Sequence, residues 1–204
     1  MELTKIYALA AGAALLALIL GSLLFVFMAK PAIGDCGGSR MGSGDVGGPF
    51  NLVDGSGLPV SESDVITKPA LVYFGYTYCP DVCPFDIARN AVAVDILAEQ
   101  GIDAVPVFIS VDPERDTAEV VAEYAEAHHP KLIGLTGTVE QVKAAADAYR
   151  VYFKKQETGD ADYLVDHTSF TYLMLPKSGF ADFFRRDTSA GEIAERVSCR
   201  VNSG

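Results

Sequence analysis

Apolar and polar residues alternate along most of the chain with periods that distinguish strands from helices. The run 70–76, ALVYFGY, is apolar at nearly every position and rich in aromatic and β-branched residues, which predicts a buried central strand. The run 104–111 has the same character and predicts a second buried strand, and 131–137 predicts a short third strand. Between the first two strands, residues 86–101 place their apolar side chains on one helical stripe that stops at Gly101.

Three further helices are predicted from capping boxes, in which a Ser, Thr or Asp precedes a Glu or Gln by three residues. They open at 116–119, 138–141 and 189–192. In the first box, Asp116 is the expected cap. The last helix is expected to end near Cys199.

Shorter patterns predict antiparallel pieces at both ends of this series. Residues 50–60, FNLVDGSGLPV, predict a hairpin that turns at 54–57. An edge strand is expected at 151–155. The runs 169–175 and 180–186 flank the turn PKSG and predict a second hairpin.

This order of elements predicts a three-layer α/β fold, because parallel βα units finish here in an antiparallel hairpin and a terminal helix. Cys79 and Cys83 follow the first buried strand directly. A thioredoxin-like fold carries its chemistry at that position, where a strand leads into a helix N-terminus. We therefore expect a thioredoxin-like fold with an N-terminal hairpin extension.

The beginning of the chain has a different character. Residues 6–28 carry no charge, and a helix of that length, roughly 34 Å at ~1.5 Å per residue, exceeds the ~30 Å core of a bilayer. A cleaved signal peptide is the alternative, but the run is long and ends in a poor cleavage site, FVFMAKP. We expect a transmembrane anchor at 6–28 after a short cytoplasmic segment at 1–5. A flexible glycine-rich tether at 29–48 and an exported domain at 49–204 follow.

Charge and cysteine content narrow the function. The net charge is −11, and the acidic domain lacks the basic patch needed to bind nucleic acid. Of the four cysteines, Cys36 and Cys199 lie near the two ends of the domain. Domain ends are often close in space, so a structural disulfide between them is favoured over two free thiols in an oxidising compartment.

The motif YTYCPDVCP, residues 76–84, is open to three interpretations: a structural disulfide, a redox switch or part of a metal site. Three residues separate Cys79 from Cys83, where thioredoxin-type oxidoreductases have two. On a helical turn, positions four apart point to the same side, so both sulfurs are expected to reach one ion or each other. A helix N-terminus also favours the thiolate that either chemistry requires.

A third ligand is expected from a histidine. His128 and His129 lie at the end of a predicted helix, and we interpret them as residues whose positive charge would suit a helix C-terminus. His167, in YLVDHTSF, stands near the point where thioredoxins have a cis-proline. Two thiolates and an imidazole suit copper(I), and an added water or carboxylate would admit copper(II). Zinc is less suited, because structural zinc sites have four ligands and no fourth is evident.

Three motifs together resemble one known family. YFGYTYCPDVCP at 73–84, SVDPERDT at 110–117 and VDHTSF at 165–170, behind one membrane anchor, resemble the Sco/SenC family of copper-binding assembly factors for cytochrome c oxidase. The resemblance spans about residues 47–200. It implies that copper is bound by Cys79, Cys83 and His167.

Neighbouring residues receive roles by the same comparison. Asp112 and Asp166 are interpreted as carboxylates beside the ligands or at the rim of the site. For Arg115, a surface position and a contact with a partner are equally favoured. The pairing of Cys36 with Cys199 is not part of the resemblance.

The resemblance implies two functions that the sequence does not separate. The first is a metallochaperone that receives copper from a periplasmic donor chaperone and delivers it to the CuA centre of oxidase subunit II. The second is a thiol–disulfide reductase that reduces the paired cysteines of that partner, so whether the protein is an enzyme stays open.

A third class, the peroxiredoxin-type peroxidases, shares the fold and ranks well below both. Such enzymes carry a threonine three residues before the reactive cysteine and a proline seven before, where this chain has Tyr76 and Val72. The chain also lacks an Arg/Ser-rich amphipathic presequence. We therefore expect a bacterial inner membrane, with the domain in the periplasm.

Overall fold

The computed structural model of the chain describes residues 5, 7, 12, 14–22, 36–37, 46–156 and 163–203. The chain divides into an N-terminal unit, Met1–Cys36 with Ser203, and a globular unit, Gly37–Asn202 with Gly204.

In the N-terminal unit, residues 14–22 are helical. No helix in the described part of the chain combines the length and the apolar character that crossing a membrane requires. About half of the predicted anchor at 6–28 and most of the predicted tether at 29–48 lie outside the described residues, and both stay predictions.

The globular unit is built on a sheet of seven strands in the order β2-β1-β5-β4-β3-β8-β9. These strands are β1 (Asn51–Asp54), β2 (Pro59–Ser61), β3 (Ala70–Gly75), β4 (Val105–Ser110), β5 (Ile133–Thr136), β8 (Thr171–Leu175) and β9 (Gly179–Phe184). Strands β3, β4 and β5 run parallel, while β1 pairs antiparallel with β5 and β8 antiparallel with β3. Every residue of β3 and β4 is buried, as their continuous apolar runs predict.

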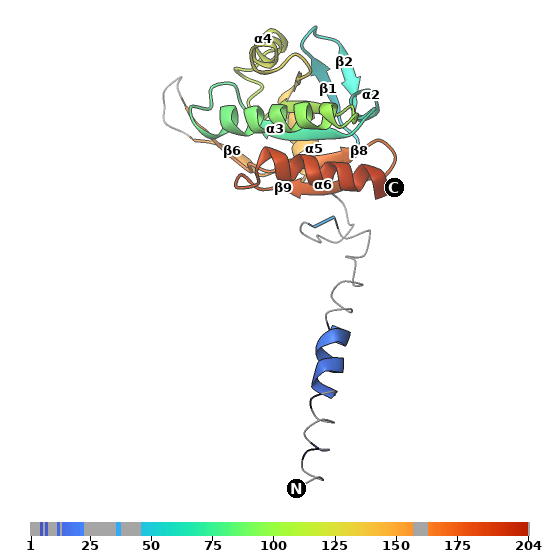
Figure 1. Cartoon of the computed structure of the whole chain (residues 1–204). Helices are drawn as coiled ribbons and strands as arrows, with labels where there is room; N and C mark the ends of the chain where they lie inside the picture. Colours follow the sequence, from blue (N-terminus) through green and yellow to red (C-terminus); the bar gives the residue numbers. More distant parts are fainter. Residues whose placement is uncertain are drawn as a thin grey trace. The chain divides into compact units, whose positions relative to one another are not determined.

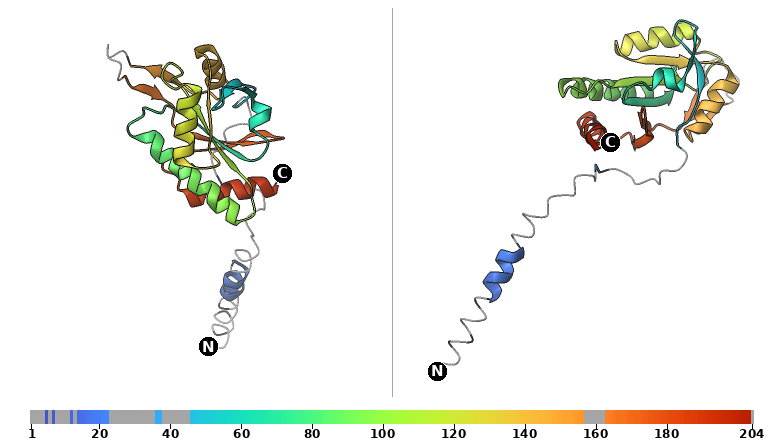
Figure 2. Two further views of the ribbon diagram at one scale, coloured as in Figure 1. Left: turned by 90° about the horizontal axis from the view of Figure 1, so that it is seen from above. Right: turned by 90° about the vertical axis from the view of Figure 1, so that its right-hand side faces the viewer.

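Helices cover both faces of this sheet (Figures 1 and 2). They are α2 (Glu62–Val65), α3 (Val82–Glu99), α4 (Ala118–His128), α5 (Val139–Ala148) and α6 (Ala190–Ser203). Helices α3, α4 and α6 lie on one face and α5 on the other (Figure 2). Because side chains alternate along a strand, Leu71 of β3 packs in the cluster beneath α3 and α6, whereas Phe74 contacts Tyr149 at the end of α5. The predicted three-layer α/β arrangement is confirmed.

Two short strands stand apart from the sheet. β6 (Phe153–Lys155) and β7 (Val165–His167) pair antiparallel with each other and form a separate two-stranded sheet, here called the histidine ribbon. The edge strand predicted at 151–155 is present as β6, and its partner is β7 and not a strand of the main sheet.

The predicted hairpins, the strands predicted at 70–76, 104–111 and 131–137, and the capping box at Thr138 and Gln141 are confirmed. The cap of α4 is not Asp116 but Thr117, whose hydroxyl accepts a hydrogen bond from the backbone N–H of Val120. Helix α6 continues to Ser203, beyond the predicted end near Cys199. The short helix α2 was not predicted.

Candidate metal centre

The two motif cysteines lie at the carboxyl end of β3, where the chain turns into α3. Helix α3 begins at Val82, so Cys83 is its second residue and Cys79 belongs to the preceding loop. The expectation that both cysteines share one helical turn is therefore wrong. The loop folds back instead, and the N–H of Cys79 donates to the carbonyl of Tyr76 at 3.2 Å.

Cys79 takes the place of a helix cap. Asp81 occupies the N-cap position of α3 without a side-chain hydrogen bond, while the N–H of Cys83 donates to Cys79 Sγ at 3.4 Å. Pro84 fits the first helical turn because its missing N–H would have no partner there. The N–H groups at the start of α3, which have no partner within the helix, therefore favour negative charge on Cys79 Sγ.

His167 reaches the cysteines from the histidine ribbon, where it is the last residue of β7 and pairs with Phe153. Its Nδ1 lies 3.1 Å from the carbonyl oxygen of Thr168. A carbonyl only accepts, so this contact places the proton on Nδ1 and leaves the lone pair of Nε2 for a ligand. Nε2 lies 3.4 Å from Cys83 Sγ.

The three side chains form a group with the composition of a metal site. Their ligand atoms all lie within 4.8 Å of one another, and Cys79 and Cys83 are free thiols. A metal with three ligands at ~2.0–2.3 Å holds their atoms about 3.5–4.0 Å apart, so the longest separation must shorten by roughly 1 Å or less when a metal binds. Two sulfurs and one imidazole nitrogen are soft donors that suit copper(I).

The reduced cysteines share their protons unequally. The pKa of Cys79 is lowered to about 3, chiefly by the hydrogen bond from the Cys83 thiol, with the N–H groups of Asp81 and Cys83 acting in the same direction against burial. The pKa of Cys83 is raised, because it donates to the Cys79 thiolate and is fully buried. One thiolate is thus present before a metal binds, and binding must release the proton of Cys83.

Aromatic rings enclose the histidine, a feature that the sequence analysis did not identify. Tyr73 and Tyr76 stand edge-on to the His167 ring, with centroids 6.1 and 5.8 Å away. Gly75 between them is required by close packing, since a Cβ there would lie 2.9 Å from Cys83 Sγ. In the sequence these tyrosines are indistinguishable from core residues of a strand.

A buried polar cluster lies on α3 beyond Cys83 and also went unpredicted. Asp86 is 3% exposed and forms an ion pair with Arg89 at 3.0 Å, and burial raises the pKa of the Asp86 carboxyl. Arg89 and Asn90 both donate to the hydroxyl of Thr171 in β8. The available signal was the phase of Asp86 and Asn90, which lie on the apolar stripe of the predicted helix.

The two carboxylates predicted beside the ligands or at the rim of the site have hydrogen-bond partners outside the ligand set, and their role at the site stays a prediction. Asp112 is buried, and its oxygens accept from Arg115 Nε and from the hydroxyl of Tyr163. Asp166 is exposed and accepts from Gln156 at 2.8 Å. Because side chains alternate along a strand, Asp166 points away from the face that carries His167.

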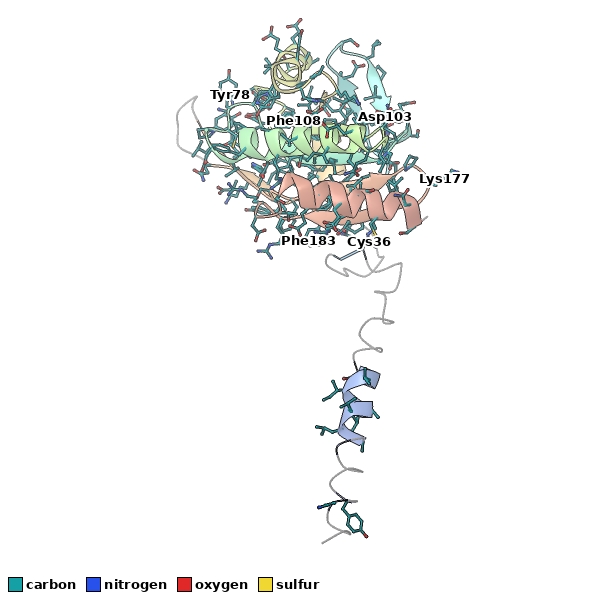
Figure 3. All side chains as sticks on the ribbon, in the orientation of Figure 1. Cys36, Tyr78, Asp103, Phe108, Lys177 and Phe183 are labelled. Atoms are coloured by element: carbon teal, nitrogen blue, oxygen red, sulfur yellow. The ribbon has the colours of Figure 1, made fainter. Side chains whose placement is uncertain are left out.

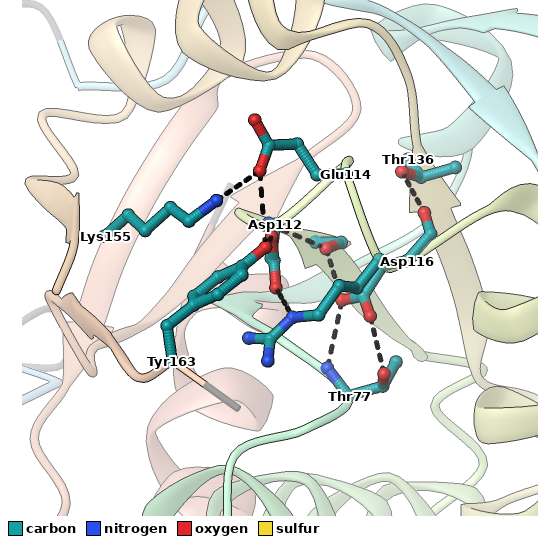
Figure 4. A network of polar contacts seen from close by, with 9 residues as sticks. Thr77, Asp112, Glu114, Asp116, Thr136, Lys155 and Tyr163 are labelled. Carbon is teal, nitrogen blue, oxygen red and sulfur yellow. Dashed lines mark hydrogen bonds and ion pairs between the residues drawn. The ribbon is translucent and has the colours of Figure 1, made fainter. Parts of the chain in front are cut away.

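Asp116 has a more direct role than the helix cap assigned to it from sequence. It is fully buried and accepts hydrogen bonds from both the N–H and the hydroxyl of Thr77, and from the hydroxyl of Ser110 (Figure 4). Burial raises the pKa of this carboxyl, and the hydrogen bonds oppose that shift. Asp116 therefore anchors the loop that carries Cys79.

The remaining candidates do not join the metal centre. His128 Nδ1 contacts the carbonyl of Tyr124 and His129 Nε2 contacts Asp95, both near the end of α4. Cys36 and Cys199 are disulfide-bonded, the state that the predicted pair requires. Since they fall in the two separately described units, their pairing with each other stays a prediction.

Comparison with known proteins identifies relatives over the whole globular unit. The SCO1/SenC family model matches residues 39–202. Protein SenC of Rhodobacter capsulatus is 54% identical over 166 residues, which cover 81% of this chain and 75% of that protein. The human mitochondrial SCO1 homolog is 42% identical over 159 residues, covering 76% of this chain and 53% of that protein.

Solved structures agree with this result. The crystal structure of Arabidopsis thaliana ScoI with copper bound has a TM-score of 0.74 and 44% identity, and covers 78% of this chain and 99% of that one. The crystal structure of yeast Sco1 with copper bound has a TM-score of 0.74 and 37% identity, and the match covers 79% of this chain and 91% of that one. The predicted thioredoxin-like fold is confirmed as the mixed α/β fold of these proteins.

Proposed function

The chain belongs to the SCO1/SenC family, and from that premise we propose that it binds copper through Cys79, Cys83 and His167 and assists the assembly of cytochrome c oxidase. The observation that carries the proposal is the convergence of these three side chains within 4.8 Å. Relatives at 44% and 37% identity have been solved with copper bound.

In its finer form, the proposal is that copper is cargo. The protein receives it from a periplasmic copper chaperone and delivers it to the CuA centre of oxidase subunit II. Three protein ligands suit delivery, because a three-coordinate ion leaves room for a ligand of the partner to bind before a ligand of this chain departs. A membrane anchor at 6–28 would hold the domain near its partner, on the periplasmic face of a bacterial inner membrane.

A second candidate function rests on the unequal thiols. The Cys79 thiolate would attack a disulfide of the partner and form a mixed disulfide, releasing one partner thiolate. Cys83, giving up its proton, would then attack Cys79 Sγ and release the second partner thiolate. The partner gains two electrons, and Cys79 and Cys83 become a disulfide that an external dithiol must reduce. The same two sulfurs serve both roles.

Copper binding is tested by anaerobic titration of the reduced full-length chain with copper(I) in the presence of a chromophoric competitor. We expect one copper per chain. His167→Ala should weaken binding at least tenfold, since two thiolates remain without the third donor. His128→Ala is the matched control, because that imidazole also contacts a backbone carbonyl but lies on α4. Equal affinity for the wild type and His167→Ala would rule out the three-ligand site.

The two roles are separated by mixing the copper-loaded chain with the metal-free soluble domain of oxidase subunit II. If the function is delivery, copper moves to a partner whose cysteines were already reduced. If it is reduction, a partner supplied with an oxidised pair becomes reduced while Cys79 and Cys83 form a disulfide. Thiol trapping with mass spectrometry, together with metal analysis of the separated proteins, reads both outcomes.

A further inference from the structure

The metal centre is assembled from two pieces that no strand pairing joins. Cys79 and Cys83 are fixed to the main sheet through β3 and α3, whereas His167 lies on the histidine ribbon, whose strands pair only with each other among the described strands. An isolated two-stranded sheet is marginally stable. A short link joins His167 to β8, which pairs with β3. Apart from that link, the distance between the sulfurs and the imidazole depends on side chains that hold the ribbon against the cysteine loop.

Arg115 contacts both pieces. Its guanidinium carbon lies 3.6 Å from the ring centroid of Tyr163, which precedes β7 by two residues. The same carbon lies 4.7 Å from the ring centroid of Tyr78, the residue before Cys79 (Figure 3). The ring of Tyr76 lies 5.8 Å away. Only 14% of the Arg115 side chain is exposed. Cations stack favourably on aromatic faces, and the interaction strengthens as the pair is desolvated.

Neighbouring charges hold this arrangement in one geometry (Figure 4). Asp112 accepts from Arg115 Nε with one oxygen and from the hydroxyl of Tyr163 at 2.7 Å with the other. Lys155 of β6 lies 3.8 Å from the Tyr163 ring centroid and forms an ion pair with Glu114. One buried carboxylate thus orients both the cation and the ring on which it stacks.

We propose that Arg115 is a positioning residue that joins the cysteine loop to the histidine ribbon and so sets where His167 stands relative to the two sulfurs. The sequence left a surface position and a partner contact open for Arg115, and its burial in this internal contact gives it a different role. The proposal deepens the proposed function and rests on it for the metal. The position of the histidine ribbon relative to the cysteine loop is a property of the metal-free chain as well, so it can be tested without copper.

Arg196 provides a matched control. Its side chain is 13% exposed, forms an ion pair with buried Asp182 at 2.6 Å and lies 4.6 Å from the ring centroid of Phe184. It thus reproduces the environment of Arg115, but on α6 and away from the metal centre. Arg115→Ala and Arg196→Ala remove comparable contacts, so a general loss of stability should affect both variants alike.

The first measurement is amide hydrogen exchange of the reduced, metal-free full-length chain. Arg115→Ala should accelerate exchange in residues 163–168 at least tenfold, and Arg196→Ala should leave that segment within twofold of the wild type. Tyr163→Phe keeps the ring on which Arg115 stacks and should exchange more slowly than Tyr163→Leu, which lacks it. If Arg115→Ala does not fold, Arg115→Lys serves instead, since it keeps the charge and loses the planar fork.

The second measurement is copper(I) affinity of the same variants. Loss of a group that orients a metal ligand typically costs about 10–100-fold in affinity, and we expect a loss in that range for Arg115→Ala but not for Arg196→Ala. Identical exchange in residues 163–168 for the two alanine variants would overturn the positioning role. If the wild type itself binds no copper, the proposed function fails, and the exchange comparison still decides the role of Arg115.

Discussion

At the scale of single residues, the main chemical fact is that two neighbouring cysteines have different acidities. The pKa of Cys79 is lowered to about 3, chiefly by the hydrogen bond from the Cys83 thiol, while that of Cys83 is raised. Reduced, metal-free protein should therefore react with iodoacetamide at Cys79 first. The rate should stay nearly constant between pH 5 and 8, because the thiolate is already fully formed.

Peptide mapping by mass spectrometry over this pH range measures the rate at each cysteine. In Cys83→Ala the strongest donor to Cys79 is missing, so the Cys79 rate should fall at pH 5 and recover a dependence on pH. A tenfold rise per pH unit in the wild type would show an ordinary thiol and contradict the assignment.

The same shift makes stability depend on pH. The folded-state pKa of Cys79 lies below its unfolded value of ~8.5, so its contribution is present above that value and is lost as pH falls toward about 3. Cys83 stays protonated in both states below ~8.5 and contributes no slope there. Urea unfolding of the reduced protein from pH 5 to 8 should show stability rising with pH, and Cys79→Ser should flatten that rise. An equal slope in the variant would assign the rise to other groups.

Gly75 is a second residue at which packing reaches the metal centre. An added Cβ would lie 2.9 Å from both Cys83 Sγ and Tyr73 Cε1, in a strand that is buried throughout. Gly75→Ala should destabilise the fold by about 1–3 kcal/mol and displace Cys83, so copper affinity should fall as well. Gly191→Ala on α6 is the control, because no atom lies within 4 Å of its added Cβ and alanine favours a helix. Wild-type copper affinity in Gly75→Ala would show that the strand adapts.

At the scale of elements, Thr117 has the capping role that the sequence suggested for Asp116. Thr117 caps α4, and Asp116 holds Thr77 in the cysteine loop. Thr117→Ala should cost about 1 kcal/mol of unfolding free energy and leave the thiols of the motif unchanged. Asp116→Ala should cost more and should also change the alkylation rate of Cys79, because its removal leaves the buried groups of Thr77 and Ser110 unpaired.

Chemical denaturation and the alkylation assay together distinguish these two variants. The contrast fails if Asp116→Ala alters stability alone, since Asp116 would then be a structural residue without influence on the loop. It also fails if Thr117→Ala changes the thiol chemistry.

At the scale of the whole molecule, the parts that local pattern determines were predictable from sequence. Continuous apolar runs located β3 and β4, and the spacing of Thr138 and Gln141 located the start of α5. The three metal-ligand candidates were identified because cysteine and histidine are chemically distinctive. What sequence did not provide was tertiary pairing: β6 joins β7, and Arg115 stacks on rings 48 and 37 positions away, at Tyr163 and Tyr78.

The hydrogen-bond partners of the carboxylates were unpredictable from sequence for a similar reason. Asp112 and Asp116 lie four residues apart in one motif. From sequence, either carboxylate could cap a helix, lie beside a metal site or anchor a loop by hydrogen bonds. Which role each fulfils depends on which partners the fold brings within hydrogen-bond distance. Those partners, Tyr163 and Thr77, come from segments that are distant in sequence.

The last prediction concerns the N-terminal segment. Residues 14–22 are helical, and Leu15, Leu16 and Leu18 are 64%, 63% and 72% exposed in the N-terminal unit. Removing such side chains from water is worth roughly 1.5–3 kcal/mol each, and the uncharged run at 6–28 offers many of them to a lipid core. We expect the full-length chain to remain with the membrane pellet after extraction with alkaline carbonate.

A variant tests whether the apolar run is the cause. Leu15→Asp with Leu18→Asp places two charges near the middle of the run, where each costs about 2.5–3.5 kcal/mol during insertion. This variant should move to the soluble fraction, whereas Leu15→Ile with Leu18→Ile should stay in the pellet. Protease added to spheroplasts should digest the globular unit of the wild type, as the proposed position on the periplasmic face requires. Recovery of the unmodified chain in the soluble fraction would overturn the anchor, and protection of the globular unit would reverse its orientation.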